Sequence, residues 1–468
     1  MNVTRALARY IASVALLGYD SDDVESARRL IADCVANAVA GAATEPGAIF
    51  RGYGESRLGS GADEASVAGS RTSFLAKDAA FLNSQMAALL DMDETYGNLA
   101  HAGSPIVFAA LAVAEREGAS GDDLILAVLT AYDVTARIVD AMRASPEKLA
   151  SDVYPFSCPD AFGPAIAASV LLGLDASQVH DALGFAGGTA RLPIVVKQRQ
   201  SPKGVIKNAQ GWHAEHGVIA ADLASLGIAG VAEVLDGPGA FWMAAGSDQW
   251  LPQSIFDGLG NDCRIKQASF KAQPACRLAH TSIEAACAAV DENGLAVEEV
   301  EKIEIVTLSR IASVPVFSDP APTEFTSAQF SVPYTVAVAL LGIAPGPAWY
   351  SRSTMADERV LSLAKRVQLI PDESGASDAA YGVNQRCVRA VARVRHRGQT
   401  HVAERAFAIG DPERPYDPVA FAARTRSLLT TGLPSARVEG LMSVLDTLST
   451  ISNVRELGRA IRPSRTGR

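Results

Sequence analysis

The spacing of apolar residues changes twice along this chain, and that change most constrains its fold. Over residues 1–265, alanine-rich apolar positions recur every three or four residues, which is typical of helices that bury one face. Residues 266–410 include runs in which apolar and polar residues alternate, as in half-buried strands, and residues 411–468 return to helical spacing. We therefore expect a mainly α protein in which both chain ends form a helical domain, with a smaller α+β domain between them.

Two helix starts carry strong local signals. Ser104 and Pro105 precede an apolar run that ends at Gly118, and a serine cap, a first-turn proline and a final glycine are typical of a helix with both ends marked. Ser120 and Asp123 have the spacing of a capping box in front of the next apolar run. These signals predict two consecutive helices.

Period-two alternation marks the strands of the second region. Residues 302–305 and 388–394 alternate apolar with polar side chains. Arg397 and Gly398 then separate the second run from another at 400–407, so a hairpin is expected. Helices are expected between the strands, at 280–291 and around 336–341.

Charge and composition exclude several classes of function. The 468 residues carry 42 Lys and Arg against 52 Asp and Glu, so the net charge is −10, and a general affinity for nucleic acid or an anionic membrane is not expected. The chain has no phosphate-binding or dinucleotide-binding glycine motif, which disfavours nucleotide hydrolysis and hydride transfer. Its six cysteines form no C-x-x-C pair, so reduced thiols in the cytoplasm are expected, and the N-terminal stretch is interpreted as an amphipathic helix rather than a signal peptide.

Three polar clusters are candidates for chemistry. The first, at 91–101, combines three acids, a threonine and His101 directly before a helix start, where main-chain N–H groups favour an anion. The second, at 197–207, has four cations and no acid, and can steer a small polycarboxylate into a cleft. The third, at 271–280, holds Lys271, a residue type whose pKa burial can tune for acid–base work. For the first two clusters, a solvated loop is the alternative.

Other reactive side chains have plainer interpretations. His213 and His216 lie three residues apart and would share a helix face, but no third ligand has a usable spacing, so no metal site is expected. Cys276 is interpreted as a structural thiol rather than a nucleophile.

Several stretches of the chain, taken in order, carry a family resemblance. They include Leu90-Asp-Met-Asp-Glu-Thr95 with His101, Lys271-x-x-Pro-x-Cys-x-x-x-His280 and Ala328-Gln-Phe-Ser-Val-Pro-Tyr334, together with shorter stretches at 78–83, 118–121, 172–175 and 182–187. In this order they resemble the MmgE/PrpD family, which includes 2-methylcitrate dehydratase, cis-aconitate decarboxylase and iminodisuccinate epimerase. The resemblance extends over most of the chain.

The resemblance implies a two-domain homodimer with its active site in the cleft between the domains. It also implies a reaction on a small polycarboxylate without a metal or an organic cofactor. The family's pocket residues fall here on Asp91, Thr95, His101, Lys271, His280 and Tyr334. Of these, Asp91, His101 and Lys271 would be catalytic, and the others would bind the substrate.

Three positions depart from the family pattern. Tyr154 stands where members commonly have a histidine, Glu215 replaces a lysine of the decarboxylases, and Ala88 replaces a frequent histidine. Tyr154 is therefore a catalytic candidate in its own right. Lys203 and Lys207 are candidates for substrate binding, because they can replace the missing positive charges.

The chemistry that fits these residues is removal of a proton next to a carboxylate. Such a step needs positive charge against the developing anion and a base within reach of the C–H group, and Asp91, His101, Tyr154 and Lys271 are all candidates for the base. Loss of a β-hydroxyl gives a dehydratase of a substrate such as 2-methylcitrate, which is the first hypothesis. Loss of CO2 gives a decarboxylase, and reprotonation from the opposite face gives an epimerase of an iminodisuccinate-like dicarboxylate. A relative that only binds a carboxylate or dimerises is the non-catalytic alternative.

Overall fold

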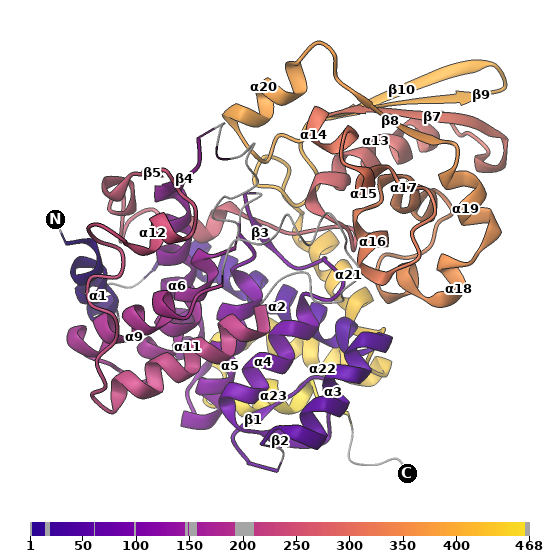
Figure 1. Ribbon diagram of the computed structural model, residues 1–468. Helices are drawn as coiled ribbons and strands as arrows, with labels where there is room; N and C mark the ends of the chain where they lie inside the picture. Colours follow the sequence, from indigo (N-terminus) through magenta and orange to yellow (C-terminus); the bar gives the residue numbers. More distant parts are fainter. Residues whose placement is uncertain are drawn as a thin grey trace.

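The computed structural model describes residues 2–14, 19–59, 61–97, 100–145, 148, 157–191 and 210–463. Helices from both ends of the chain form a larger helical part. It lies beside a smaller part that contains the main sheet and is mostly orange in Figure 1. The prediction of a mainly α protein with a smaller α+β portion is confirmed.

The helical part is built around α5 (Gly103–Glu117), which is buried from Gly103 to Glu115. It packs against α4 (Ala76–Ala87), α6 (Gly121–Ala141), α8 (Phe162–Leu171) and α11 (Gln210–Ser225). These helices approach closely because small residues line their contacts: a Cβ at Gly211 of α11 would lie 2.7 Å from the carbonyl oxygen of Phe81 in α4. The other helices are α1 (Val3–Ser13), α2 (Ser21–Ala42), α3 (Glu45–Arg57), α9 (Ala176–Gly188) and α12 (Phe241–Ala244).

Both predicted helix starts are present, with one correction. The Oγ of Ser120 accepts from the main-chain N–H of Asp123, and Asp123 accepts from that of Ser120, so the capping box of α6 is confirmed. Helix α5 ends before Gly118 as predicted. It starts two residues earlier than expected, because the carboxyl group of Glu94, from another segment, caps its first turn in place of the Ser104 side chain.

The main sheet has four strands in the order β10–β9–β7–β8. Its strands are β7 (Val300–Thr307), β8 (Val367–Pro371), β9 (Ala390–His396) and β10 (Gln399–Arg405). The β7–β8 pair is parallel and the other two pairs are antiparallel. The predicted hairpin joins β9 to β10, and its turn residues Arg397 and Gly398 have φ values of 48° and 75°, as a tight hairpin turn requires.

Helices cover this sheet and connect its strands. The predicted helix at 280–291 is α13 (His280–Asp291), which packs on β9, β10 and α17 (Val332–Leu340). The remaining helices of this part are α14 (Ser309–Ala312), α15 (Pro315–Ser318), α16 (Phe325–Phe330), α18 (Arg352–Met355), α19 (Glu358–Ala364) and α20 (Ala376–Val383).

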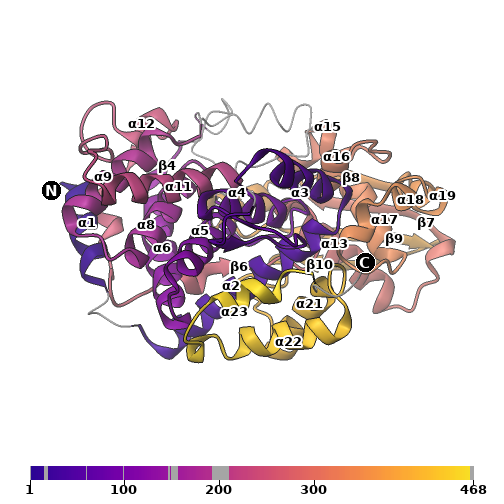
Figure 2. The ribbon, with the colours of Figure 1, turned by 90° about the horizontal axis from the view of Figure 1, so that it is seen from below.

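The last helices of the chain pack on the first ones. They are α21 (Pro418–Leu429), α22 (Ser435–Asp446) and α23 (Arg455–Ala460); the first two contact α2 and the third contacts α5, and Figure 2 shows them, in yellow, below the helical part. The boundaries at 265 and 410 stay predictions. No helix within the described ranges has the length and apolar character to cross a membrane.

Three two-residue strand pairs connect loops of the helical part. They are β1 (Ala65–Ser66) with β2 (Ser73–Phe74), β3 (Thr95–Tyr96) with β6 (Ala268–Ser269), and β4 (Met142–Arg143) with β5 (Gln249–Trp250). The second pair brings the first and third polar clusters together.

Candidate active site

The pairing of β3 with β6 places Lys271 beside the acidic turn. Thr95 lies opposite Ser269 in this antiparallel pair, so the chain that leaves β6 runs back past the residues that precede β3. Lys271, two residues beyond β6, is fully buried and points at Asp91. The two clusters, 180 residues apart in sequence, therefore form one site.

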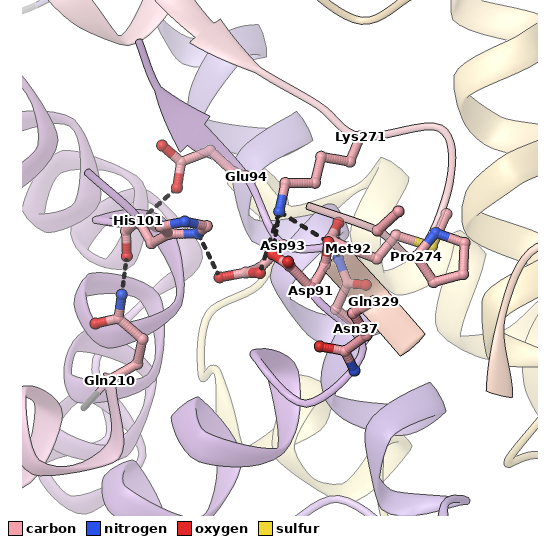
Figure 3. Close-up of polar contacts among 12 residues, drawn as sticks. Asn37, Asp91, Met92, Asp93, Glu94, His101, Gln210, Lys271, Pro274 and Gln329 are labelled. Carbon is pink, nitrogen blue, oxygen red and sulfur yellow. Dashed lines mark hydrogen bonds and ion pairs between the residues drawn. The ribbon is translucent and has the colours of Figure 1, made fainter. Parts of the chain in front are cut away.

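Asp91 binds the Lys271 ammonium twice. The Nζ atom of Lys271 lies 2.5 Å from Oδ1 of Asp91 and 2.8 Å from its main-chain oxygen (Figure 3). Asp91 has φ of 51°, a left-handed conformation that non-glycine residues adopt at a cost of order 1 kcal/mol and that is concentrated at functional sites. Both side chains are 0% exposed, so each charge relies on the other for compensation.

Asp93 connects this ion pair to His101. Its Oδ1 atom is 3.9 Å from Nζ of Lys271, and its Oδ2 atom is 3.1 Å from Nδ1 of His101. Burial opposes the negative charge of Asp93, but His101 and Lys271 outweigh it and lower the pKa of this carboxyl. The result is a buried row of four groups: a carboxylate, an ammonium, a second carboxylate and an imidazole.

The main chain of His101 is held from both sides. Its N–H donates to Oδ2 of Asp160 at 3.1 Å, and its carbonyl oxygen accepts from Nε2 of Gln210, the first residue of α11, at 2.9 Å. Burial raises the pKa of Asp160 to about 7. The histidine is thus fixed by residues from two elements other than its own turn.

Glu94 closes the turn that carries His101. Its carboxyl accepts from the N–H of Gly103 at 2.7 Å, and from the hydroxyl of Tyr132 in α6. Burial raises the pKa of Glu94 well above its ordinary value. The start of α5, which the sequence suggested as an anion-binding position, is therefore already capped by a carboxyl of the protein.

Arg424 of α21 donates hydrogen bonds to both chain segments that form the site. Its Nε donates to the main-chain oxygen of Lys271 at 2.6 Å, and one Nη donates to that of Met92 at 3.2 Å. The other Nη lies 2.7 Å from Oδ1 of Asp33 in α2. Asn37 of α2 also donates to the oxygen of Met92. The C-terminal and N-terminal helices thereby set the separation of Lys271 from the acidic turn.

Of the predicted substrate-binding residues, Thr95 lies within the same turn. Its Oγ1 is buried and has no hydrogen-bond partner among the described residues, so it is available to a ligand oxygen. The hydroxyl of Tyr334 donates instead to the main-chain oxygen of Trp349, and its ring stacks on Tyr350. The role of Tyr334 in substrate binding stays a prediction.

His280 donates a hydrogen bond to the loop that carries Lys271. Its Nε2 donates to the carbonyl oxygen of Ala275 at 3.1 Å, and burial together with Arg277 and Lys271 lowers the pKa of the ring well below its ordinary value. His280 is therefore a neutral group at pH 7 within this loop. Its role in substrate binding also stays a prediction.

Three candidates, Tyr154, Lys203 and Lys207, lie outside the described residues. Glu215, the acid that replaces a family lysine, faces α4: its Oε1 is 3.9 Å from Nζ of Lys77. All six cysteines are described, and none of them is paired in a disulfide.

Ligand atoms of Asp91, Asp93 and His101 lie within 4.8 Å of one another and so have the spacing of a metal site. The ammonium of Lys271 contacts Asp91 and faces Asp93, so a cation already compensates these carboxylates. A divalent ion would have to displace that ammonium against charge repulsion. The expectation of a reaction without metal stays a prediction.

The sequence placed Asp93 in the acidic cluster without giving it a role, and it missed Asp160, Gln210 and Arg424. The signal for Asp93 was its two-residue spacing from Asp91. Arg424 had no local signal, because its partner Asp33 is 391 residues away.

Comparison with known proteins identifies the family of this chain. Residues 5–252 match the MmgE/PrpD N-terminal domain and residues 274–447 match the MmgE/PrpD C-terminal domain. Cis-aconitate decarboxylase of Mus musculus is 30% identical over 322 residues, which are 65% of this chain and 63% of that protein. The Homo sapiens protein of the same name is 30% identical over 275 residues, 56% of this chain and 55% of that protein. The aligned part is thus under two thirds of the length of these relatives. Because the two domain matches together span most of the sequence, the chain belongs to the MmgE/PrpD family, as its motifs indicated.

Proposed function

We propose that the protein is a lyase that transfers a proton at the carbon next to a carboxylate of a small di- or tricarboxylate. The observation that carries the proposal is the buried Lys271 ammonium, 2.5 Å from Asp91 and one carboxylate away from His101. An ammonium fixed in a site that excludes water stabilises negative charge as it develops on a substrate carboxylate. A histidine within the same array is suited to take up and return the proton.

The site carries less negative charge than its number of acids suggests. Burial raises the pKa of Glu94 well above its ordinary value and that of Asp160 to about 7, so burial disfavours the charged form of both groups. Asp91 and Asp93 remain against the one ammonium of Lys271. A substrate with two or three carboxylates needs further positive charge, and we assign that role to Lys203 and Lys207.

Dehydration of a hydroxylated substrate such as 2-methylcitrate is the first reaction that we propose. The base removes the proton from the carbon beside the carboxylate, and the electron pair of that C–H bond forms the double bond. The β-hydroxyl takes up a proton and leaves as water. Glu215, an acid that faces Lys77, stands where decarboxylase members have a lysine, and this favours dehydration over decarboxylation.

Decarboxylation is the second candidate, because the relatives that match are named cis-aconitate decarboxylases. An epimerase in which Tyr154 and Lys271 act from opposite faces is the runner-up outside the lyases. We also expect a homodimer, as in the family.

A panel of substrates separates these reactions. The protein is incubated with 2-methylcitrate, citrate, cis-aconitate and an aminodicarboxylate, and products are followed by proton NMR and CO2 release. Dehydration gives an alkene without CO2, decarboxylation gives CO2, and epimerisation gives exchange at the α-carbon without net loss. Turnover should fall at least about 100-fold in His101→Asn, whereas His401→Asn on the β10 hairpin should be unaffected. No change in any compound would refute the proposal.

A further inference from the structure

Asp93 faces both His101 and Lys271, and the reaction proposed above gives it no role. Its two oxygens face different groups, Oδ2 the imidazole of His101 at 3.1 Å and Oδ1 the ammonium of Lys271 at 3.9 Å (Figure 3). The side chain is 1% exposed, so these neighbours and not bulk water compensate its charge.

Asp93 acts on His101 as a hydrogen-bond acceptor. An ionised carboxylate has no proton to donate, so the contact between Oδ2 and Nδ1 requires the ring proton on Nδ1. The lone pair of a neutral ring is then on Nε2. Asp160 and Gln210 hold the main chain of His101 on both sides, and Asp93 contacts its ring at Nδ1.

We propose that Asp93 is a positioning residue that holds His101 in the Nδ1-protonated form, so that Nε2 is the nitrogen that takes up the substrate proton. The catalytic consequence rests on the proposed proton transfer. The tautomer itself is a property of the protein without substrate, and can be measured independently.

Lys271 gives the variant Asp93→Asn a definite outcome. An asparagine side chain has a carbonyl oxygen at one position and an NH2 group at the other. The Lys271 ammonium attracts the oxygen and repels the NH2 group, so the NH2 group turns toward Nδ1 of His101. A ring nitrogen that accepts a hydrogen bond carries no proton, and the ring is therefore driven into the Nε2-protonated form.

Nitrogen-15 NMR of protein labelled at its histidine rings tests the proposal. Ring couplings and shifts distinguish the two tautomers at a pH where the ring is neutral, and His101→Gln identifies the signal by its loss. We expect Nδ1–H in the wild type and Nε2–H in Asp93→Asn. Asp78→Asn is the control: it changes a buried carboxylate beside Lys77 in the first turn of α4 and should leave the His101 signal unchanged. A wild-type ring protonated on Nε2, or a variant that keeps Nδ1–H, would overturn the proposal.

Kinetics separates positioning from a general structural role. With a substrate from the panel, Asp93→Asn should lower kcat about 100-fold or more and change KM little, and Asp93→Glu should regain the Nδ1–H signal together with part of kcat. Equal loss in the asparagine and glutamate variants would contradict positioning. If no compound is turned over, the proposed function fails while the NMR result still decides the tautomer. If Asp93→Asn does not fold, the wild-type spectrum alone decides it.

Discussion

Replacing Lys271 with methionine removes a buried charge and nearly preserves the side-chain length. In the wild type, Nζ of Lys271 and Oδ1 of Asp91 lie 2.5 Å apart and both side chains are 0% exposed. At an effective dielectric constant of about 20, their attraction is about 7 kcal/mol, most of which offsets the cost of removing both charges from water. The variant leaves the Asp91 carboxylate without that partner.

Protonation of Asp91 limits the cost of this substitution. Protonating a carboxyl group with an ordinary pKa of about 3.9 costs about 4 kcal/mol at pH 7 and about 1.5 kcal/mol at pH 5. The folded variant then holds a proton that the unfolded chain releases, so its stability falls as pH rises over this range. We expect Lys271→Met to lower the free energy of unfolding by about 4 kcal/mol at pH 7 and by about 1.5 kcal/mol at pH 5.

Urea denaturation followed by circular dichroism at both pH values measures this difference. The double variant Asp91→Asn with Lys271→Met should recover most of the lost stability, because no buried charge is then left alone. Lys266→Met, which removes an exposed lysine paired with Asp20 and Asp23, is the control and should cost less than about 1 kcal/mol. A cost for Lys271→Met that is below about 1 kcal/mol, or equal at both pH values, would show that Asp91 does not depend on the Lys271 charge.

Three further predictions concern a buried acid of α5, the arginine that contacts the site from α21, and the role of metals. Burial raises the pKa of Glu115 to about 7, so the folded protein keeps a proton there that the unfolded chain loses above about pH 4.5. The free energy of unfolding should therefore fall as pH rises from about 4.5 to about 7. Glu115→Gln should remove up to about 3 kcal/mol of that loss in urea titrations at pH 4.5 and 8; an unchanged pH dependence would contradict the assignment. Arg424→Lys removes the guanidinium donors to the main-chain oxygens of Lys271 and Met92. It should lower the free energy of unfolding by about 1–3 kcal/mol and also lower kcat. The control Arg426→Lys, on the same helix and paired with the exposed Glu439, should change neither quantity. Dialysis against a chelator should leave turnover unchanged, because an ammonium compensates the carboxylates of the site; loss of turnover that zinc or magnesium restores would show that this is wrong.

Local signals predicted the elements that depend on local interactions. The capping box at Ser120 and the hairpin turn at Arg397 and Gly398 involve residues within three positions of one another, and both are present. The start of α5 was placed two residues late, because its capping carboxyl comes from Glu94 across a turn. The strand β8 was not predicted; it pairs in parallel with β7 across a long connection.

The same distinction holds for the site. The two polar clusters and the family resemblance pointed to Lys271, Asp91 and His101 as candidates. Their contact depends on the β3–β6 pairing of two residues from each segment, which is too short to leave a pattern in the sequence. The support from Arg424 depends on packing between the two ends of the chain. Side-chain direction was equally out of reach, as the hydroxyl of Tyr334 shows by donating to Trp349.

Solvent deuterium incorporation shows whether these residues transfer a proton next to a carboxylate. Each acid of the panel is incubated with the protein in deuterium oxide, and NMR detects deuterium at the carbon next to the carboxylate. We expect the wild type to incorporate deuterium into at least one compound or its product. Lys271→Met and His101→Asn variants that remain folded should lose this incorporation. Incorporation at the wild-type rate in both variants would contradict this expectation.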